Sequence, residues 1–273
     1  MTLGEKDHMS EWKIDQNIKA AFFDADGTMI SFATHRVPES TLVALRELRQ
    51  SGVRCFLCTG RAPYTVEEVP LDSLEAFILF NGQFILNRDG ILYQETMNKA
   101  DIATIVGQVQ AGMYQCLFMT AERMFVSGHD DLVRSIEAKV GLTYEEDDPA
   151  LALDSDIYQL NVFLEPGQTD VVKRACNSIK MTRWTREFVD VFPRGGGKDR
   201  AVRKVLELYG IAPEEAIAFG DGGNDLGMFG VCGTSVAMGN GNPEVREQAD
   251  FVTDDVDRDG IYNACVRLGL IGR

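Results

Sequence analysis

Two aspartates one residue apart, Asp24 and Asp26, carry the clearest chemistry in this 273-residue sequence. They close an apolar run over residues 18–23 that is short enough for a buried strand, and Gly27 and Thr28 indicate a tight turn. Positions two apart on an extended chain project to the same side, so the turn can direct both carboxylates at one point. Like charges buried together need a cation or a shared proton. One site that needs both is a Mg²⁺-assisted phosphoryl transfer, in which one carboxylate attacks phosphorus and the other handles the leaving-group proton.

The same run has two plainer interpretations, a solvated turn or half of a calcium-binding loop. A calcium loop of the helix–loop–helix type needs a later glycine and a glutamate at its twelfth position, where this chain has His35. The calcium loop therefore fails on spacing. The solvated turn and the catalytic pair both stay open until other motifs are considered.

Both ends of the chain alternate apolar, strand-like runs with helix-like stretches. The predicted strands are 18–23, 53–58, 76–80, 216–219, 235–237 and 251–252. The predicted helices are 39–51, 63–68, 198–209, 225–229, 243–248 and a last stretch that ends at residue 268. Such alternation predicts an α/β fold, a doubly wound parallel sheet covered on both faces, built from residues 18–82 and 192–273.

The middle of the chain, residues 83–191, has a different pattern. A turn-rich stretch between two apolar runs predicts a β-hairpin over 83–93. Two further runs, 157–163 and 188–192, alternate apolar and polar residues and predict half-exposed strands. Helices are expected near 98–112 and 130–140. We therefore expect an inserted α+β cap domain with an antiparallel sheet.

Polar motifs follow three of the predicted core strands. Residues 24–26 follow the first strand, residues 59–61 the second, and Asp221 the first strand after the insert. Open α/β sheets bind ligands at the carboxyl ends of their strands, so these motifs are expected to meet. The Thr59 hydroxyl and the Gly60 backbone N–H would cradle a phosphate oxygen at a helix start. The alternative is a strand-to-helix turn that Thr59 caps.

The stretch around Asp221 combines glycines with oxygen ligands. Asp221 supplies a hard oxygen ligand, and the flanking glycines let the backbone approach an ion closely. Asn224 and Asp225 are placed to orient Asp221 or to hold metal-bound waters. A plain glycine turn is the alternative.

Lys198 follows three glycines at the start of a predicted helix and offers a positive charge. The stretch is not a Walker A loop, since Phe192 stands where the first glycine belongs and Asp199 where Ser or Thr belongs. The alternative is a lysine whose side chain is simply solvated.

Together these motifs resemble those of the haloacid dehalogenase-like (HAD) hydrolases, specifically the Cof-type subfamily with a C2B cap. The resemblance covers nearly the whole chain from residue 18, with order and spacing in agreement. Small departures are Ala25, where a larger apolar residue is commoner, and Cys58 before Thr59. The matching segments are Asp24-Ala25-Asp26-Gly27-Thr28, Thr59-Gly60-Arg61, Asn81-Gly82, Lys198, Gly220-Asp221-Gly222-Gly223-Asn224-Asp225, Val236-Ala237-Met238-Gly239-Asn240 and Asp259-Gly260-Ile261.

The resemblance implies a covalent mechanism and a Mg²⁺ site. Asp24 would be the nucleophile and form an aspartyl phosphate. Asp26 would protonate the leaving alcohol and then activate water. Mg²⁺ would be held by the Asp24 carboxylate, the Asp26 backbone carbonyl and Asp221. The phosphate-binding residues would be Thr59, Gly60, Lys198 and Asn224.

By the same resemblance, the insert would be a lid that selects the substrate by its leaving group. Candidates for leaving-group contact are Arg61, Asn81, Arg183 and Arg186, with Trp184 between the last two. For residues 183–186 a surface turn is the alternative.

The expected function is a Mg²⁺-dependent phosphatase of small phosphorylated metabolites, with sugar phosphates as the expected substrates. A phosphomutase shares the nucleophile and is one alternative. A non-catalytic protein that binds phosphorylated metabolites is another, although a sensor has no need for the nucleophile Asp24.

The overall composition limits the partners and the compartment. The net charge of −15 repels polyphosphate backbones and argues against a nucleic-acid partner. No apolar run approaches the ~20 residues of a membrane span. Residues 1–16 are polar and lack the apolar centre of a signal peptide, which predicts a cytoplasmic protein. The six cysteines lie mostly in apolar stretches and are expected to be buried, reduced thiols.

Overall fold

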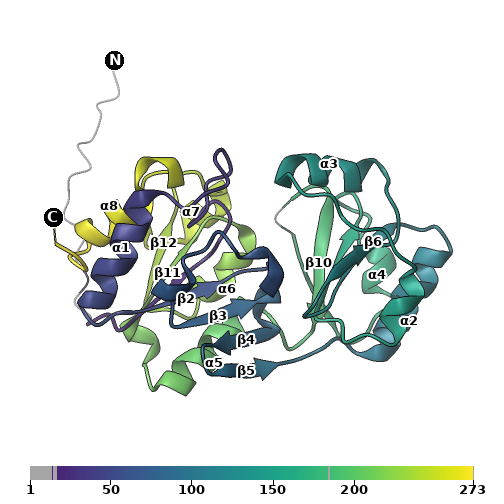
Figure 1. Cartoon of the computed structure of the whole chain (residues 1–273), viewed down its shortest axis with the longest axis horizontal. Helices are drawn as coiled ribbons and strands as arrows, with labels where there is room; N and C mark the ends of the chain where they lie inside the picture. Colours follow the sequence, from purple (N-terminus) through teal and green to yellow (C-terminus); the bar gives the residue numbers. More distant parts are fainter. Residues whose placement is uncertain (1–13, 15–16, 184, 273) are drawn as a thin grey trace, which may run out of the picture.

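Two β-sheets of unequal size organise the chain, as Figure 1 shows. The structure is a computed structural model that describes residues 14, 17–183 and 185–272. The larger sheet has the strand order β13 (Phe251–Val252), β12 (Thr234–Ala237), β11 (Ala216–Gly220), β1 (Ala20–Phe23), β2 (Arg54–Cys58), β3 (Ala76–Leu79), β4 (Phe84–Asn87) and β5 (Gly90–Gln94). The smaller sheet has the order β7 (Met124–Val126), β6 (Gln115–Met119), β8 (Gln159–Phe163), β10 (Phe188–Pro193) and β9 (Ile179–Thr182).

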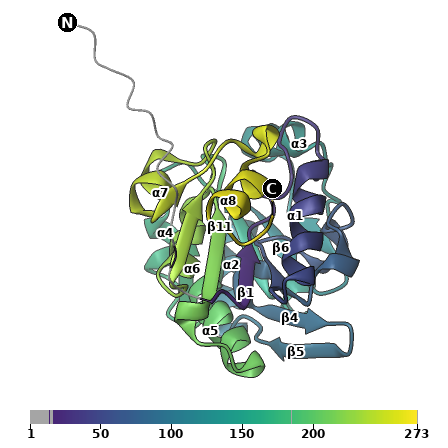
Figure 2. The same cartoon turned by 90° about the vertical axis from the view of Figure 1, so that its left-hand side faces the viewer.

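The larger sheet is parallel from β13 to β3, and β1 lies between β11 and β2. One face is covered by α1 (Glu39–Gln50) and α8 (Gly260–Arg267), the other by α5 (Lys198–Tyr209), α6 (Leu226–Phe229) and α7 (Pro243–Gln248). Figure 2 shows α1 and α6 on opposite sides of these strands. The predicted doubly wound α/β core is therefore confirmed.

The two faces of β1 show why its sequence is apolar throughout. Phe22 stacks on Phe56 with 4.8 Å between ring centroids, on the face that α5 covers. Phe23 stacks on Phe219 at 4.9 Å, on the face that α1 covers. A strand buried on both faces needs an unbroken apolar run rather than an alternating one.

The hairpin predicted over 83–93 forms, but it belongs to the core sheet rather than to the insert. β4 pairs antiparallel with β3, and β5 pairs antiparallel with β4. The inserted domain therefore begins after Gln94, later than the expected boundary at residue 83. The physical reason is that the free edge of β3 accepts a further strand, which buries Ile85 against the core helices.

The cap is an antiparallel sheet with helices on both sides. Its back is covered by α2 (Lys99–Gln110) and α4 (Asp170–Lys173). α3 (Asp131–Val140) packs on the front, the side that faces the core domain (Figure 1). The pattern in the sequence predicted α2, α3, β8 and β10, but not β6, β7, β9 or α4.

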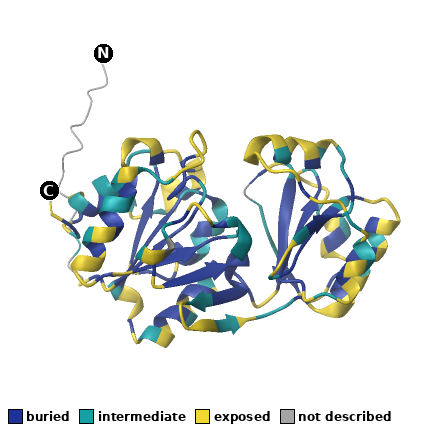
Figure 3. Ribbon diagram, in the orientation of Figure 1, coloured by how far each residue is buried: buried dark blue, intermediate teal, exposed yellow. Residues whose placement is uncertain are grey.

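The front of the cap sheet is buried, contrary to the prediction of half-exposed strands (Figure 3). The alternate polar residues of β8 and β10 face the core domain instead of water. Tyr158, just before β8, stacks on Phe80 of the core with 5.4 Å between ring centroids. One apolar cluster therefore continues from the core into the cap.

Other expectations concern the cysteines and membranes. All six cysteines are free and buried, and Cys55 and Cys58 lie on opposite faces of the core sheet. In the part of the chain that the structure describes, no helix has both the length and the apolar character to cross a membrane. The compartment prediction rests on residues 1–16, of which the structure describes only residue 14. Trp184 also lies outside the described residues.

Phe56 offers a test of the core packing. It is fully buried, stacks on Phe22 and meets the ring of Tyr209 at 5.2 Å between centroids. Phe56→Ala should lower the free energy of unfolding by about 3–5 kcal/mol, because it leaves a cavity. The control is Leu208→Ala, in the same helix as Tyr209. Because Leu208 is 53% exposed, this substitution should change the free energy of unfolding by less than about 0.5 kcal/mol. Chemical denaturation followed by far-UV circular dichroism measures both, and equal losses would contradict this packing.

Candidate active site

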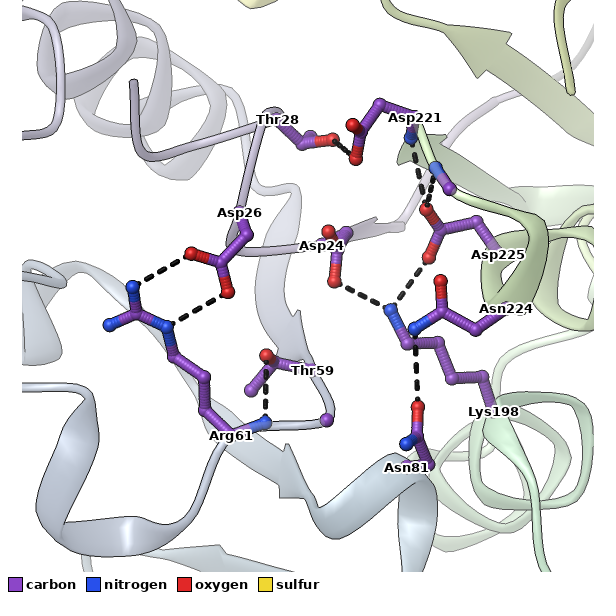
Figure 4. A network of polar contacts seen from close by, with 12 residues as sticks. Asp24, Asp26, Thr28, Thr59, Arg61, Asn81, Lys198, Asp221, Asn224 and Asp225 are labelled. Carbon is purple, nitrogen blue, oxygen red and sulfur yellow. Dashed lines mark hydrogen bonds and ion pairs between the residues drawn. The ribbon is translucent and has the colours of Figure 1, made fainter. Parts of the chain in front are cut away.

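Three polar motifs meet at the carboxyl end of the core sheet. Because β11, β1 and β2 are neighbours, the residues that follow them are neighbours as well. Asp221 follows β11, Asp24 follows β1 and Thr59 follows β2. Figure 4 shows Asp24 in the middle of this group, with Lys198 of α5 beside it.

Lys198 lies between two carboxylates. Its Nζ is 2.6 Å from Asp24 Oδ1 and 2.6 Å from Asp225 Oδ1, and its side chain is 1% exposed. Burial by itself lowers the pKa of Lys198, but the carboxylates of Asp225 and Asp24 raise it above its ordinary value. Lys198 is therefore a fixed positive charge and not a solvated lysine.

Asp24, Asp221 and Asp225 form a carboxylate cluster in which one oxygen of each lies within 4.8 Å of the others. Burial, followed by the charge of Asp225, raises the pKa of Asp24 to about 7. Burial, followed by the charge of Asp24, raises the pKa of Asp221 to about 9. One ammonium cannot balance three carboxylates, so the cluster lacks positive charge. An all-oxygen ligand set of this kind fits a hard divalent cation such as Mg²⁺.

Asp225 also fixes the loop that carries Asp221. Its Oδ2 accepts hydrogen bonds from the backbone N–H groups of Asp221 and Gly222, each at 2.9 Å. Gly220 is needed there, because a Cβ at this position would lie 2.5 Å from the Cβ of Asp225. Asp225 thus orients Asp221 and pairs with Lys198, and the second contact is one that the sequence did not indicate.

The turn after β1 reaches the loop after β11 through Gly27. Its φ is 75°, which favours glycine, and a Cβ would lie 2.3 Å from Asp221 Oδ2. Thr28 Oγ1 donates to Asp221 Oδ1 at 3.4 Å, and Asn240 Nδ2 donates to the Gly27 carbonyl at 2.8 Å. The two motifs are therefore in direct contact.

Asp26 turns away from Asp24 and toward Arg61 (Figure 4). Arg61 Nε lies 2.9 Å from Asp26 Oδ2, and Arg61 Nη2 lies 2.7 Å from Asp26 Oδ1. Arg61 Nη1 also donates to the Thr65 carbonyl at 2.6 Å. For Asp26 to transfer a proton to a leaving group, its carboxylate has to part from this bidentate pair.

The phosphate-binding candidates form one wall beside Asp24. Thr59 Oγ1 accepts the Arg61 N–H at 3.1 Å, the capping contact, and no acceptor for its own hydroxyl proton is found among the described residues. Asn224 Nδ2 donates to Asn81 Oδ1 at 3.2 Å. Gly60 lies against Asn81, where a Cβ would approach Asn81 Nδ2 to 3.0 Å.

The two cap arginines have their side chains engaged within the cap. Arg183 Nη1 donates to the Arg186 carbonyl at 2.7 Å, and Arg186 Nε lies 2.8 Å from Glu165 Oε2. These contacts brace the loop between β9 and β10. The main chain of that loop does reach the core, because the Arg183 carbonyl lies 3.7 Å from the Cβ position of Gly223.

A cavity of about 150 Å³ lies between the core and the cap. Lys198 and Asn224 line it from the core, and Lys180, Thr182 and Phe192 line it from the cap. Thr182 Oγ1 is buried and has no hydrogen-bond partner in the described part of the chain. Because β9 was not predicted, the sequence reasoning missed Lys180 and Thr182, although the alternation along this strand was an available signal.

Sequence reasoning also missed three polar residues on the front of the cap sheet. Gln159, Asn161 and Asp190 are each at most 4% exposed, and Gln159 and Asp190 contact Asn81 of the core. Alternation alone does not distinguish contact with water from contact with another domain. The signal that could have found them is an Asp in a short strand that is otherwise entirely apolar.

Comparison with known proteins assigns the family. A family model described as haloacid dehalogenase-like hydrolase matches residues 21–265. YkrA of Bacillus subtilis (strain 168), which is named as a phosphatase, is 34% identical over 256 residues, 93% of this chain and 98% of the relative.

Two solved structures match across both domains. The sugar phosphatase BT4131 of HAD subclass IIB has a TM-score of 0.86 and 27% identity, over 93% of this chain and all (100%) of that chain. BT1666 from Bacteroides thetaiotaomicron, named among the phosphatases of this superfamily, has a TM-score of 0.87 and 28% identity, over 99% and 100% of the two chains. The chain therefore belongs to the haloacid dehalogenase-like hydrolases and is a phosphatase of that superfamily.

Proposed function

We propose that this phosphatase hydrolyses small phosphomonoesters, sugar phosphates in particular, with Mg²⁺ and through an aspartyl phosphate on Asp24. The observation that carries the proposal is the buried Asp24–Lys198–Asp225 group with Asp221 beside it. A carboxylate can approach a phosphate dianion only where fixed positive charge offsets their repulsion. The similarity to the sugar phosphatase BT4131 supports the class of leaving group.

In the first step, a carboxylate oxygen of Asp24 attacks phosphorus. A new oxygen–phosphorus bond forms while the bond from phosphorus to the ester oxygen breaks. Asp26, once it has parted from Arg61 and taken up a proton from solvent, gives that proton to the departing ester oxygen, so that the leaving group departs as an alcohol. Lys198, whose Nζ lies 2.6 Å from Asp24 Oδ1, offsets the crowding of negative charge.

In the second step, water attacks the phosphorus of the aspartyl phosphate. Asp26 accepts the proton of the water, the bond to Asp24 breaks, and inorganic phosphate is released. The Thr59 hydroxyl, the Gly60 N–H and the Asn224 amide donate to the oxygens of the transferring group. These donors contact only the phosphoryl group, which every substrate of this class shares.

Asp24 and Asp221 would hold the metal through their carboxylates, and Asp26 through its backbone carbonyl. When bound, Mg²⁺ neutralises negative charge and polarises a phosphoryl oxygen. Asp225 is already engaged with Lys198 and with two backbone N–H groups, so its part is to orient Asp221.

The leaving group would be a small polyhydroxylated alcohol that reaches the cavity beside Lys198. A dry cavity of about this volume takes a ligand of roughly six heavy atoms, such as benzene. The wall here is polar, because Thr182 brings an unpartnered hydroxyl and Asn224 an amide. A hydroxyl of the leaving group would satisfy Thr182.

Asp24→Asn tests the nucleophile. An amide cannot form the acyl phosphate, so turnover should be abolished while the circular dichroism spectrum is unchanged. Asp26→Asn should lower kcat by roughly 10²–10⁴, the usual contribution of a general acid. Steady-state kinetics with p-nitrophenyl phosphate and Mg²⁺ measure both variants. Normal turnover in folded Asp24→Asn would refute the mechanism. In a separate assay with a sugar phosphate, transfer of the phosphoryl group to another hydroxyl of the sugar would indicate a phosphomutase.

Removal of the metal should abolish activity, and Mg²⁺ should restore it. Because burial and crowding raise the pKa of Asp24 to about 7 and that of Asp221 to about 9, protons compete with Mg²⁺ for these oxygens. Mg²⁺ should therefore raise the melting temperature of EDTA-treated protein more at pH 8 than at pH 5.5. The metal-free protein itself should lose stability as pH rises from about 4 to 9. Its unfolded carboxylates ionise above about pH 4, whereas the folded protein holds the proton of Asp24 up to about pH 7 and that of Asp221 up to about pH 9.

Thermal-shift titrations measure this metal binding independently of activity. Asp221→Asn is the control and should lose most of the Mg²⁺-induced shift at pH 8. A shift that is the same at both pH values, or full activity in chelator, would contradict the assigned ligands.

Two threonines allow a matched comparison of core and cap. Thr182→Val removes a cap hydroxyl and should lower kcat/KM by about tenfold for sugar phosphates, the effect of one hydrogen bond, and far less for p-nitrophenyl phosphate. Thr59→Val removes a core hydroxyl and should lower kcat/KM for all substrates by a similar factor, since it acts on the transferring group. A substrate panel measures both, and a uniform effect of Thr182→Val would reject its contact with the leaving group.

A further inference from the structure

Buried amide and carboxylate side chains connect the catalytic edge of the core to the front of the cap sheet. The contacts run from Asn224 through Asn81 to Gln159 and Asp190, with Asn161 beside Asp190. We call these five residues the interdomain bridge. Except for Asn224 they are at most 4% exposed, so their hydrogen bonds are made away from water.

Asn81 lies at the middle of the bridge, and its backbone is hydrogen-bonded to the loop that carries Thr59 and Gly60. Its N–H donates to the Thr59 carbonyl at 2.9 Å. Its φ of 52° and ψ of 31° lie in the left-handed region, which asparagine enters more readily than most residues. This turn, directly after β3, directs the Asn81 side chain out of the core and toward the cap.

The two ends of the Asn81 side chain serve different domains. Its Oδ1 accepts from Asn224 Nδ2 at 3.2 Å, beside Lys198 (Figure 4). Its Nδ2 donates to Gln159 Oε1 at 2.9 Å and lies 3.4 Å from Asp190 Oδ2. An amide is planar, so the orientation that satisfies the cap acceptors also sets the position of the oxygen that holds Asn224.

The Asn81 amide also helps to stabilise a buried carboxylate of the cap. Asp190 is a buried carboxylate that receives amide donors, Asn161 Nδ2 at 2.5 Å and Gln159 Nε2 at 3.4 Å in addition to Asn81. Burial raises the pKa of Asp190 to about 7, and the bonds from Asn81 and Asn161 act against that shift. Gln159 Nε2 also donates to the Gly60 carbonyl at 3.3 Å, a second contact between the cap and the phosphate-binding loop.

We propose that Asn81 is a positioning residue that couples docking of the cap to the orientation of Asn224. With the cap docked, Gln159 and Asp190 fix the Asn81 amide, and the amide fixes Asn224. When the cap moves away, Asn81 loses its two cap acceptors and is free to turn. Phosphate binding by Asn224 is then completed only under a docked cap. This inference rests on the proposed function in giving Asn224 a phosphate to bind.

Three variants test the bridge. Asn81→Gly removes the amide while glycine keeps the left-handed backbone, and Gln159→Met removes the cap acceptor with little change in volume. Tyr64→Phe is the matched control, because the Tyr64 hydroxyl donates to the Thr120 carbonyl at 3.4 Å, a core–cap contact outside the bridge. Circular dichroism and thermal denaturation show that each variant is folded.

Kinetics with p-nitrophenyl phosphate and Mg²⁺ provide the first measurement. Asn81→Gly and Gln159→Met should each lower kcat by roughly 10- to 100-fold, the effect of a catalytic contact misplaced by about 1 Å. The double variant should be no slower than the slower single variant, because both substitutions interrupt one path. Tyr64→Phe should stay within about twofold of the wild type.

Small-angle X-ray scattering of the metal-free proteins provides a measurement that needs no activity. The radius of gyration should be larger in Asn81→Gly and Gln159→Met than in the wild type and Tyr64→Phe, because the cap loses its docking contact. Multiplied losses in the double variant, or an equal loss in Tyr64→Phe, would overturn the coupling. If the wild type hydrolyses no phosphoester, the proposed function fails, and the scattering result alone decides whether the bridge docks the cap.

Discussion

A buried ammonium between two carboxylates is the interaction on which the rest of this structure depends. Taking Lys198, Asp24 and Asp225 out of water is costly, and their attraction repays that cost only when the geometry is fixed. Three separate elements fix it: the end of β1, the first turn of α5 and the loop after β11. The parallel sheet makes these elements neighbours, because β1 and β11 are adjacent strands and α5 packs on the face that they share.

The cap also buries a carboxylate but stabilises it in a different way. Its buried carboxylate, Asp190, accepts hydrogen bonds from the neutral amides of Asn161 and Gln159, and the charge of Lys198 also favours its ionised form. These amides stabilise the charge without adding a second ammonium near Lys198. Their geometry is directional, so they hold the two domains in one register as well as stabilising the charge. The carboxyl edge of the core sheet thus relies on charge pairing, and the interface above it on hydrogen-bond direction.

The sequence predicted which polar residues meet at the carboxyl edge of the core sheet because that information is local. Asp24, Thr59 and Asp221 each follow a short apolar run, and parallel neighbours end at the same edge whatever the rest of the chain does. The cap face could not be located in this way. Gln159 and Asp190 alternate with apolar residues, and that pattern is the same whether the polar side meets water or another domain. The hairpin from β4 to β5 was assigned to the wrong sheet for a related reason, because a short apolar run does not specify which sheet edge it joins.

The apolar cluster that passes from the core into the cap has a consequence for the independence of the two domains. Residues 95–194 are continuous in sequence and carry a complete sheet, which suggests a module that could be cut out. Yet Tyr158 packs on Phe80 and Phe84, so the front of the cap is completed by core side chains. An excised cap would present that apolar surface to water and would tend to associate or lose its packing. The insert is a separate layer of the architecture but not an autonomous folding unit.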